Sequence, residues 1–242
     1  KAQREVVNEL KKKVDGLSKW ERPRTHGVNG YSTPTPVTDG KHVWCLFGNG
    51  VAACYDLEGN RKWVRHVEAP THGWGMSRSP QLADGKMIVQ VNTLKALNAE
   101  TGTEEWTAKV PWAWGSPIVE TVGDVTVVIT PKGHVVRASD GKVLAGGLGG
   151  LTYATPFVID GVAYFIEGKS SAVKLAAGDE AKPVKTDKVW QTGDLRNDRY
   201  YASSVLYGGR LYAVTQKGHY SVVDAATGEV LNTSMEKPKP KK

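Results

Sequence analysis

The stretch Asn98-Ala-Glu-Thr-Gly-Thr-Glu-Glu-Trp106 decides the fold, because related stretches recur along the chain. In each of them a turn built on Thr-Gly, or on a similar pair, is followed by a short extended segment. Trp63 and Trp106 are 43 residues apart, and Trp106 and Trp190 are 84 apart, which is two periods of 42. The related closing stretches are 56–63, 138–145 and 224–231, and a longer polar loop that ends at Trp190 replaces the turn in the fourth unit. A period near 42 residues is typical of the four-stranded blades of a β-propeller.

The units also open on similar stretches, which are residues 31–34, 77–80, 114–117, 153–156 and 201–204. The first four of these stretches end in a proline, and a proline at a strand start costs no ladder hydrogen bond. Asn49-Gly50, flanked by two apolar runs, is a hairpin signal. The sequence predicts an all-β propeller of four-stranded antiparallel blades over residues 26–235, with five blade units visible. Trp63, Trp106 and Trp190 are expected on the fourth strands, packed between neighbouring blades.

The two ends differ from the repeats. In residues 1–25, Val7, Leu10, Val14 and Leu17 recur at three- and four-residue steps, which predicts a short amphipathic helix and a linker. One interpretation is that this helix packs on the propeller, and another is that it lies on a membrane surface. Residues 236–242 form a basic tail. No run approaches the ~20 apolar residues of a transmembrane helix, and any export signal is expected to be removed or to lie upstream.

The net charge of +7 comes from these ends, because residues 1–24 contribute +4 and residues 236–242 contribute +3. The body between them is neutral. A nucleic-acid partner is not expected, since a binding face for it would need lysines and arginines clustered within the fold.

The closing motif of the type Ala-x-x-Thr-Gly-x-x-x-Trp, clearest at residues 99–106 and 225–231, resembles the repeat of pyrroloquinoline-quinone (PQQ)-like propellers. That family includes quinoprotein alcohol dehydrogenases and a BamB-like branch of outer-membrane assembly lipoproteins, and the resemblance covers residues 26–234. Family members commonly have seven or eight blades. The five visible units are therefore either a complete ring or, as we favour, part of a propeller that other blades or chains complete. The resemblance implies the fold and leaves the function open.

The resemblance to quinoprotein dehydrogenases also implies a possible cofactor, PQQ with calcium, often beside a disulfide between adjacent cysteines. Calcium needs several converging oxygen ligands, and the predicted inner strands supply mainly Ser, Thr, Pro and aromatic residues. The six histidines have no metal-ligand spacing. We therefore expect no metal, no cofactor and no catalytic residue, and favour a protein that is not an enzyme. A PQQ-dependent oxidoreductase or another propeller enzyme is the alternative.

The only cysteines, Cys45 and Cys54, flank the turn signal Asn49-Gly50. A two-residue turn there would make Gly48 face Val51 and Cys45 face Cys54, in a non-hydrogen-bonded pair. Two interpretations remain open, a disulfide that would favour an oxidising compartment and a pair of buried free thiols.

Aromatic residues precede the predicted innermost strands. We place Tyr31, Trp114, Tyr153 and Tyr201 at one repeat position, with His26, His72, Trp74, Arg78, Trp112 and Arg199 nearby. Propeller symmetry would gather them around one mouth of the channel, and Tyr, Trp and Arg dominate binding hot spots. Packing repeated by symmetry is the alternative.

We expect a non-catalytic platform for a protein or glycan partner. The family resemblance implies a periplasmic or cell-surface location in a bacterium.

Overall fold

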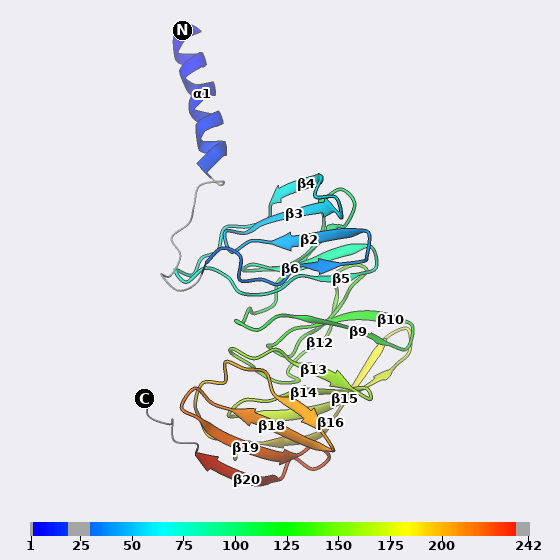
Figure 1. Ribbon diagram of the computed structural model, residues 1–242. Helices are drawn as coiled ribbons and strands as arrows, with labels where there is room; N and C mark the ends of the chain where they lie inside the picture. The colour runs from blue at the N-terminus through cyan, green and yellow to red at the C-terminus, as the bar shows by residue number, and fades with distance from the viewer. Residues whose placement is uncertain (1, 19–29, 236–242) are drawn as a thin grey trace, which may run out of the picture.

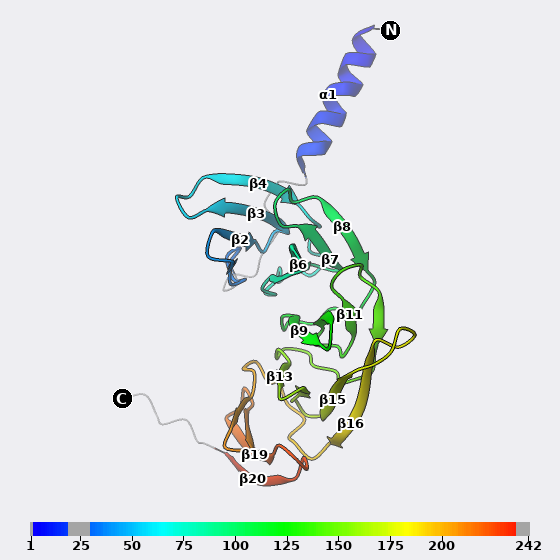
Figure 2. The ribbon, with the colours of Figure 1, turned by 90° about the vertical axis from the view of Figure 1, so that its right-hand side faces the viewer.

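The computed structural model describes residues 2–18 and 30–235, which form one helix and five four-stranded antiparallel sheets. Each sheet is built from four strands that are consecutive in the sequence, and we number the sheets blade 1 to blade 5. In Figure 2 the blades follow an open arc, with blades 1 and 5 at its ends. Strands β9 (Ile118–Val122) and β13 (Phe157–Ile159) lie toward the concave side, and β8 (Glu104–Ala108) and β16 (Val184–Thr192) toward the convex side. The propeller of antiparallel blades predicted from the repeat is confirmed.

The strands follow one another in order within each blade. Blade 1 contains β1 (Val37–Thr38), β2 (His42–Leu46), β3 (Val51–Asp56) and β4 (Arg61–His66), and blade 2 contains β5 (Gln81–Ala83), β6 (Lys86–Gln90), β7 (Leu94–Asn98) and β8. Blade 3 contains β9, β10 (Val125–Ile129), β11 (Val135–Arg137) and β12 (Val143–Ala145), and blade 4 contains β13, β14 (Val162–Phe165), β15 (Ser170–Ala177) and β16. Blade 5 contains β17 (Val205–Tyr207), β18 (Arg210–Val214), β19 (His219–Asp224) and β20 (Val230–Met235).

The core lies between the blades rather than inside any one of them. Successive side chains of a strand point to opposite faces of its sheet, so Met87 packs toward blade 1 while Ile88 packs toward blade 3. Over the described residues, four buried clusters fill the four layers between neighbouring blades. Each layer joins at least one pair across it: Leu46 with Met87, Ile88 with Val128, Ile129 with Phe165, and Tyr164 with Leu211.

In three of the blades, a tryptophan on the fourth strand joins the blade to the next one. The indole Nε1–H of Trp63 donates to the carbonyl of Ala99 at 2.9 Å, and a Cβ on Gly102 would lie 2.6 Å from the Trp63 ring. We call this carbonyl and glycine, both in the closing turn of the following blade, a tryptophan socket. The contact recurs, with hydrogen bonds of 2.8 Å, from Trp106 to the socket of Ala138 and Gly141 and from Trp190 to that of Ala225 and Gly228. The predicted equivalence of the three tryptophans is confirmed.

One hydroxyl residue per blade, just before each first strand, forms a second connection, which we call the hydroxyl ladder. In each step the backbone N–H of one member donates to the side-chain oxygen of the next, at 2.9 to 3.0 Å. The members are Thr35, Ser79, Ser116, Thr155 and Ser203. The ladder corrects the alignment of the first unit, because Thr35-Pro36 and not Thr33-Pro34 matches Ser79-Pro80 of blade 2.

The predicted pairing of Cys45 with Cys54 is wrong. Cys45 lies opposite Ala53, and Cys54 lies opposite Trp44, so the two thiols are on opposite faces of the sheet. Both are free cysteines. The register differs by one because the turn has three residues between Phe47 and Val51, with a positive φ of 79° at Gly50. A two-residue type I′ turn would also need a positive φ at Asn49, which that residue does not adopt.

Helix α1 (Ala2–Ser18) is present as predicted. Residues 3–13 of the helix do not pack on the propeller, since they are exposed and the helix projects away from blade 1 in Figure 1. Val7 and Leu10 of the predicted apolar stripe, and Val6 next to them, are each about half exposed. No helix in the described part of the chain combines the length and the apolar character needed to cross a bilayer. The basic tail, 236–242, lies outside the described residues.

Candidate binding face

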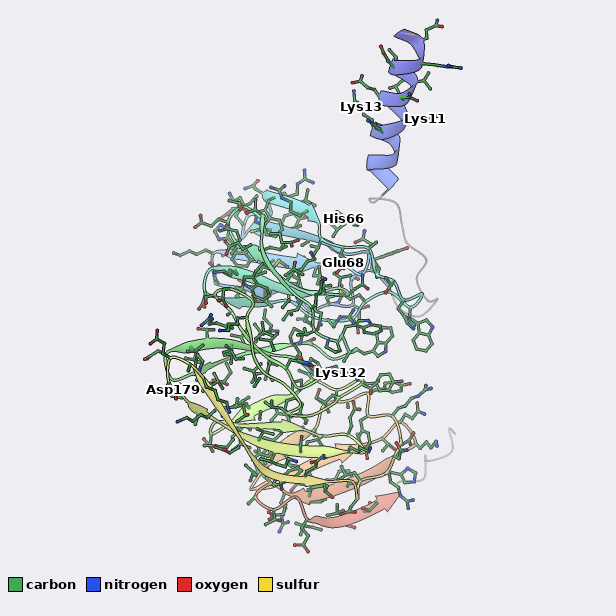
Figure 3. The ribbon with its side chains drawn as sticks, turned by 180° about the vertical axis from the view of Figure 1, so that it is seen from behind. Lys11, Lys13, His66, Glu68, Lys132 and Asp179 are labelled. Carbon is green, nitrogen blue, oxygen red and sulfur yellow. The ribbon has the colours of Figure 1, made fainter. Side chains whose placement is uncertain are left out.

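The loops that lead from the last strand of one blade to the first strand of the next carry most of the predicted binding residues. Since each first strand begins at these loops and ends at an Asp-Gly or Gly-containing turn, the loops share one end of the blades. Figure 3 shows Asp179 at the opposite end, with Glu68 and Lys132 nearer the loops. His26 lies outside the described residues.

Four aromatic side chains from two adjacent loops form a compact group that we call the tryptophan cluster: His72, Trp74, Trp112 and Trp114. The ring centroid of His72 lies 4.9 Å from that of Trp114 and 6.1 Å from that of Trp112. Several of these contacts are edge-to-face, a favourable arrangement for aromatic rings. Trp74 and His72 are exposed, with 48% of Trp74 accessible. The cluster therefore presents an aromatic surface to solvent.

A second aromatic group lies on the next two loops. The rings of Tyr153 and Tyr201 are 4.9 Å apart and meet edge-to-face, and the Arg199 guanidinium donates to the Tyr201 hydroxyl at 3.1 Å. Tyr201 is 51% exposed, and Arg199 is exposed as well. We call these three residues the tyrosine cluster.

The loops that carry the two clusters are in contact. The backbone N–H of Trp114 donates to the carbonyl of Thr152 at 2.8 Å. At Gly115 a Cβ would lie 2.0 Å from the carbonyl oxygen of Ala154, so only glycine permits this approach. The tryptophan and tyrosine clusters thus lie on neighbouring, directly bonded loops.

Arg78 does not belong to the exposed face, in contrast to the prediction. It is 3% exposed. Its guanidinium donates to the carbonyls of Gln90 at 2.7 Å and Ala113 at 2.6 Å, and also to that of Val91. Burial lowers the pKa of Arg78 to about 10, so the group is still charged at neutral pH. These bonds use most of its donors, which leaves a supporting role for the residue.

This supporting role has a clear target. The guanidinium carbon of Arg78 lies 4.9 Å from the ring centroid of Trp112, in a cation–π contact. Because Ala113 lies between Trp112 and Trp114, the bond from Arg78 to its carbonyl fixes the segment that carries both rings.

Two glutamates fix the same end of the blades, and the sequence analysis missed both. Glu167 accepts hydrogen bonds from the backbone N–H groups of Thr152 at 2.9 Å, Tyr153 at 2.8 Å and Ala154 at 3.1 Å. Glu68 accepts similar bonds from residues 92 and 93, at 3.0 and 3.1 Å. Charge-assisted bonds of this kind are stronger than neutral ones. No local signal in the sequence distinguishes these two glutamates from other acidic residues of the body.

Tyr31 is not equivalent to the other predicted aromatics. Counting back from the hydroxyl ladder, Trp114, Tyr153 and Tyr201 share one position, which Thr33 occupies in blade 1 and Ser77 in blade 2. Tyr31 is half-buried, and its carbonyl accepts the N–H of Gly48. The two prolines of Tyr31-Ser-Thr-Pro-Thr-Pro36 made the first unit ambiguous.

A cavity of about 930 Å³ lies between blades 1 and 2 at the opposite end of the blades. Its lining includes Asp39, Trp44, Lys62, Lys86 and Glu105. The Lys62 and Lys86 ammonium groups form ion pairs, with Asp56 at 2.9 Å and with Glu105 at 3.4 Å. Two of the lysines that line the cavity are thus paired with carboxylates of the chain, and none of the predicted binding residues lies there.

The arrangement of acidic groups bears on the PQQ and calcium alternative. Across residues 2–18 and 30–235, no group of three or more His, Cys, Asp or Glu side chains is placed to hold a metal ion. At the aromatic end, Glu68 and Glu167 are already bonded to backbone N–H groups. Asp198 accepts the backbone N–H of Arg199 at 2.9 Å, and Asp194 accepts the hydroxyl of Thr192 at 2.8 Å. These carboxylates therefore already have hydrogen-bond partners within the chain.

Four-stranded blades, tryptophan sockets and a 42-residue repeat together define a propeller of PQQ-like repeats. A family model described as outer membrane protein assembly factor BamB matches residues 90–239. That match covers more than half of the chain, and the chain belongs to this family. No curated protein sequence matches the chain significantly.

Solved structures agree on the fold. BamB from Moraxella catarrhalis matches with a TM-score of 0.59 and 16% identity, over 84% of this chain and 63% of that one. Quinohemoprotein alcohol dehydrogenase from Comamonas testosteroni gives 0.61 and 16%, over 89% and 44%. The computationally designed protein Ika8 gives 0.50 and 16%, over 83% and 61%. At this identity the likeness shows the fold alone, and the chain spans less than two thirds of each of these proteins.

Proposed function

We propose that the chain is part of a non-catalytic, extracytoplasmic platform that binds a protein partner through the tryptophan and tyrosine clusters. The observation that carries this proposal is the exposure of large aromatic rings on loops that buried groups hold in place. Trp74 and Tyr201 are about half exposed, whereas the socket tryptophans Trp63 and Trp106 are less than a tenth exposed. Tryptophan thus occurs both in the sockets and on the loops, and only the loops leave its ring available to a partner.

Pre-organisation favours binding by these loops. Ordering a side chain or loop at an interface opposes association, and a surface that is already ordered avoids much of that cost. Arg78 ties the segment that carries Trp112 and Trp114 to the hairpin of β6 and β7. Glu167 ties the segment that carries Tyr153 to the hairpin of β14 and β15. Aromatic anchors on such a surface are typical of hot spots in protein interfaces.

The family supports a protein partner and a location outside the cytoplasm. Its description names an outer membrane protein assembly factor, and a BamB is among the similar structures. A glycan is the alternative ligand, because exposed tryptophan and tyrosine rings also stack on sugars.

The proposal is tested by capture experiments on envelope proteins with the variants Trp74→Ala and Tyr201→Ala. We expect each variant to lose a defined partner that the wild-type chain retains, by at least ~2 kcal/mol in binding free energy, which is about thirtyfold in Kd. The matched control is Tyr207→Ala, which removes a 76% exposed ring on blade 5 away from the loops. Equal recovery by all variants, with binding of the wild type to a glycan array, would favour the glycan alternative.

A quinoprotein function is tested separately. Titration of the purified chain with PQQ and calcium, followed by absorbance, should give no saturable complex if the platform proposal is correct. A stoichiometric complex would favour the dehydrogenase alternative.

A further inference from the structure

The charges of the propeller body are divided unequally between its two ends. The connecting loops and the turns between second and third strands share the aromatic end, and they carry seven Lys or Arg and four Asp or Glu, a net charge of +3. Since residues 25–235 are neutral as a whole, the rest of the body carries −3. We call the aromatic end the basic end. Its segments are residues 47–50, 67–80, 91–93, 109–117, 130–134, 146–156, 166–169, 193–204 and 215–218.

The carboxylates of the basic end mostly serve the chain itself. Glu167 is 8% exposed and accepts backbone N–H groups, and Glu68 accepts those of residues 92 and 93. The side chain of Asp198 is 9% exposed, and it accepts the backbone N–H of Arg199. Of the four carboxylates, Asp194 alone belongs to an exposed residue. Three of the four negative charges therefore support the loops instead of facing a partner.

The cations of the basic end are mostly exposed and unpaired, unlike those elsewhere. At the opposite end, Lys62 and Lys86 pair with carboxylates at 2.9 and 3.4 Å. At the basic end Lys217 approaches Asp198 only to 3.9 Å. Apart from the buried Arg78, five more cations of this end form no ion pair within residues 2–18 and 30–235. They are the exposed Lys109, Lys169, Arg196 and Arg199, and the half-buried Lys132.

Some of these cations come from segments that contact the loop of the tyrosine cluster, residues 193–204. The backbone N–H of Gln216 donates to the carbonyl of Arg199 at 2.8 Å, which joins the turn 215–218 to this loop. A Cβ on Gly168 would lie 3.2 Å from the carbonyl oxygen of Arg196, so the turn 166–169 also touches the loop. We call three cations on these segments the basic rim: Lys169, Arg196 and Lys217.

Exposed cations beside exposed aromatic rings fit a partner that is itself acidic. Carboxylates form strong, often bidentate hydrogen bonds with arginine, and complementary charge speeds association and selects among partners. We propose that the partner of the platform binds through a protein segment rich in Asp and Glu. Its carboxylates contact the basic rim and Arg199, while its apolar side chains contact the aromatic clusters. This inference rests on the proposed function and adds the chemistry of the partner to it.

A nucleic acid fits this face less well than an acidic protein segment does. A site for nucleic acid needs a strongly basic field over the domain, whereas the body is neutral and the basic end carries only +3. The partly exposed Trp74 and Tyr201, with charged residues around them, correspond instead to the aromatic core and polar rim of a protein interface.

Selection from a random peptide library tests the proposal on the full chain. Displayed twelve-residue peptides are selected on the wild type, and those that Trp74→Ala no longer retains are sequenced. We expect an excess of Asp and Glu over Lys and Arg in these peptides. A synthetic copy of one should bind about three- to a hundredfold more weakly to the rim variant, which combines Lys169→Glu, Arg196→Glu and Lys217→Glu. Each exposed ion pair changes affinity by about 1.4- to fivefold.

The matched control reverses three exposed cations at the opposite end, through Lys41→Glu, Lys142→Glu and Lys182→Glu. It changes the net charge by the same amount, and because these sites lie well beyond the screening length it should alter affinity by less than about twofold. Arg199 is kept in both variants so that the tyrosine cluster is intact. For the wild type, raising NaCl from about 0.05 M to about 0.5 M should weaken binding severalfold, a measurement that does not depend on any variant folding.

The outcomes separate this inference from the proposed function. Peptides that depend on Trp74 but show no acidic excess, or that bind the rim and control variants equally, would overturn the acidic partner and leave the platform intact. Loss of oligothymidylate binding in the rim variant, with peptide binding unchanged, would assign the basic rim to a nucleic acid instead. If no recovered peptide depended on Trp74 or Tyr201, the platform itself would be refuted, and this inference with it.

Discussion

The contact between Trp106 and Gly141 offers the sharpest test of how the blades are held together. Trp106 is 9% exposed and donates its indole N–H to Ala138 at 2.8 Å. Truncation to alanine removes the buried ring and leaves a cavity, which typically costs ~3–5 kcal/mol. For a chain of this size each kcal/mol lowers Tm by about 2–4 °C. Trp106→Ala should therefore lower Tm by about 6–20 °C.

The partner mutation Gly141→Ala separates two costs. Gly141 has a φ of 75°, where an L-residue pays about 1–2 kcal/mol. Its Cβ would also lie 2.7 Å from the Trp106 ring, and forced overpacking typically adds ~1–3 kcal/mol. In the Trp106→Ala background the second cost disappears. The double mutant should thus be more stable than the sum of the single effects predicts, by about 1–3 kcal/mol.

Urea denaturation followed by far-ultraviolet circular dichroism measures each free energy of unfolding, with Trp74→Ala as the control for loss of a tryptophan. Because Trp74 is 48% exposed, its removal should cost less than about 1.5 kcal/mol, the upper range for aromatic contacts. A cost below ~1 kcal/mol for Trp106→Ala, or strict additivity with Gly141→Ala, would refute the socket as a stabilising contact.

Three further outcomes are expected. Burial raises the pKa of Tyr200 to about 12, so the folded state holds this proton more tightly than the unfolded state. The stability it contributes is complete below pH ~10 and is lost as pH rises toward 12, and the stability difference between wild type and Tyr200→Phe should narrow over that window. Alkylation in denaturant without reductant should label both Cys45 and Cys54, since they are free and on opposite faces, whereas a single unlabelled disulfide would contradict the register. Arg78→Lys should cost at least ~2 kcal/mol in thermal melts, because one ammonium cannot reach all the carbonyls of the guanidinium, while Arg199→Lys at an exposed site should change stability by less than ~0.5 kcal/mol.

The sequence predicted the repeat because its signals are local and periodic. A glycine that needs a positive φ, followed four residues later by a tryptophan, is visible at Gly59 and Trp63 and again at Gly102 and Trp106. The register of β2 against β3 depended instead on the turn type. Asn-Gly fits a two-residue turn, but it also fits a three-residue turn in which only the glycine has a positive φ. This difference of one residue moved Cys45 to the other face of the sheet from Cys54.

The aromatic residues of the candidate site were largely predictable, and their supports were not. Trp114, Tyr153 and Tyr201 share a repeat position that the sequence displays. Arg78 was assigned to the binding surface because arginine is common in hot spots, yet it lies beneath that surface. Its partners, Gln90 and Ala113, are 12 and 35 residues away. Their proximity follows from how adjacent blades stack, which no local pattern in the chain expresses.

The stacking also explains why the exposed aromatics occur on these loops. The layers between blades accept a side chain only where it meets a complementary surface, as Trp63 meets Gly102. The connecting loops lie beyond the ends of the strands, so their rings contact one another, as His72 contacts Trp114, or a nearby arginine, as Trp112 contacts Arg78. Mutual edge-to-face contact holds such rings in place and leaves part of each accessible. A propeller can therefore change the residues on these loops without altering its layers, and it is there that a partner would be selected.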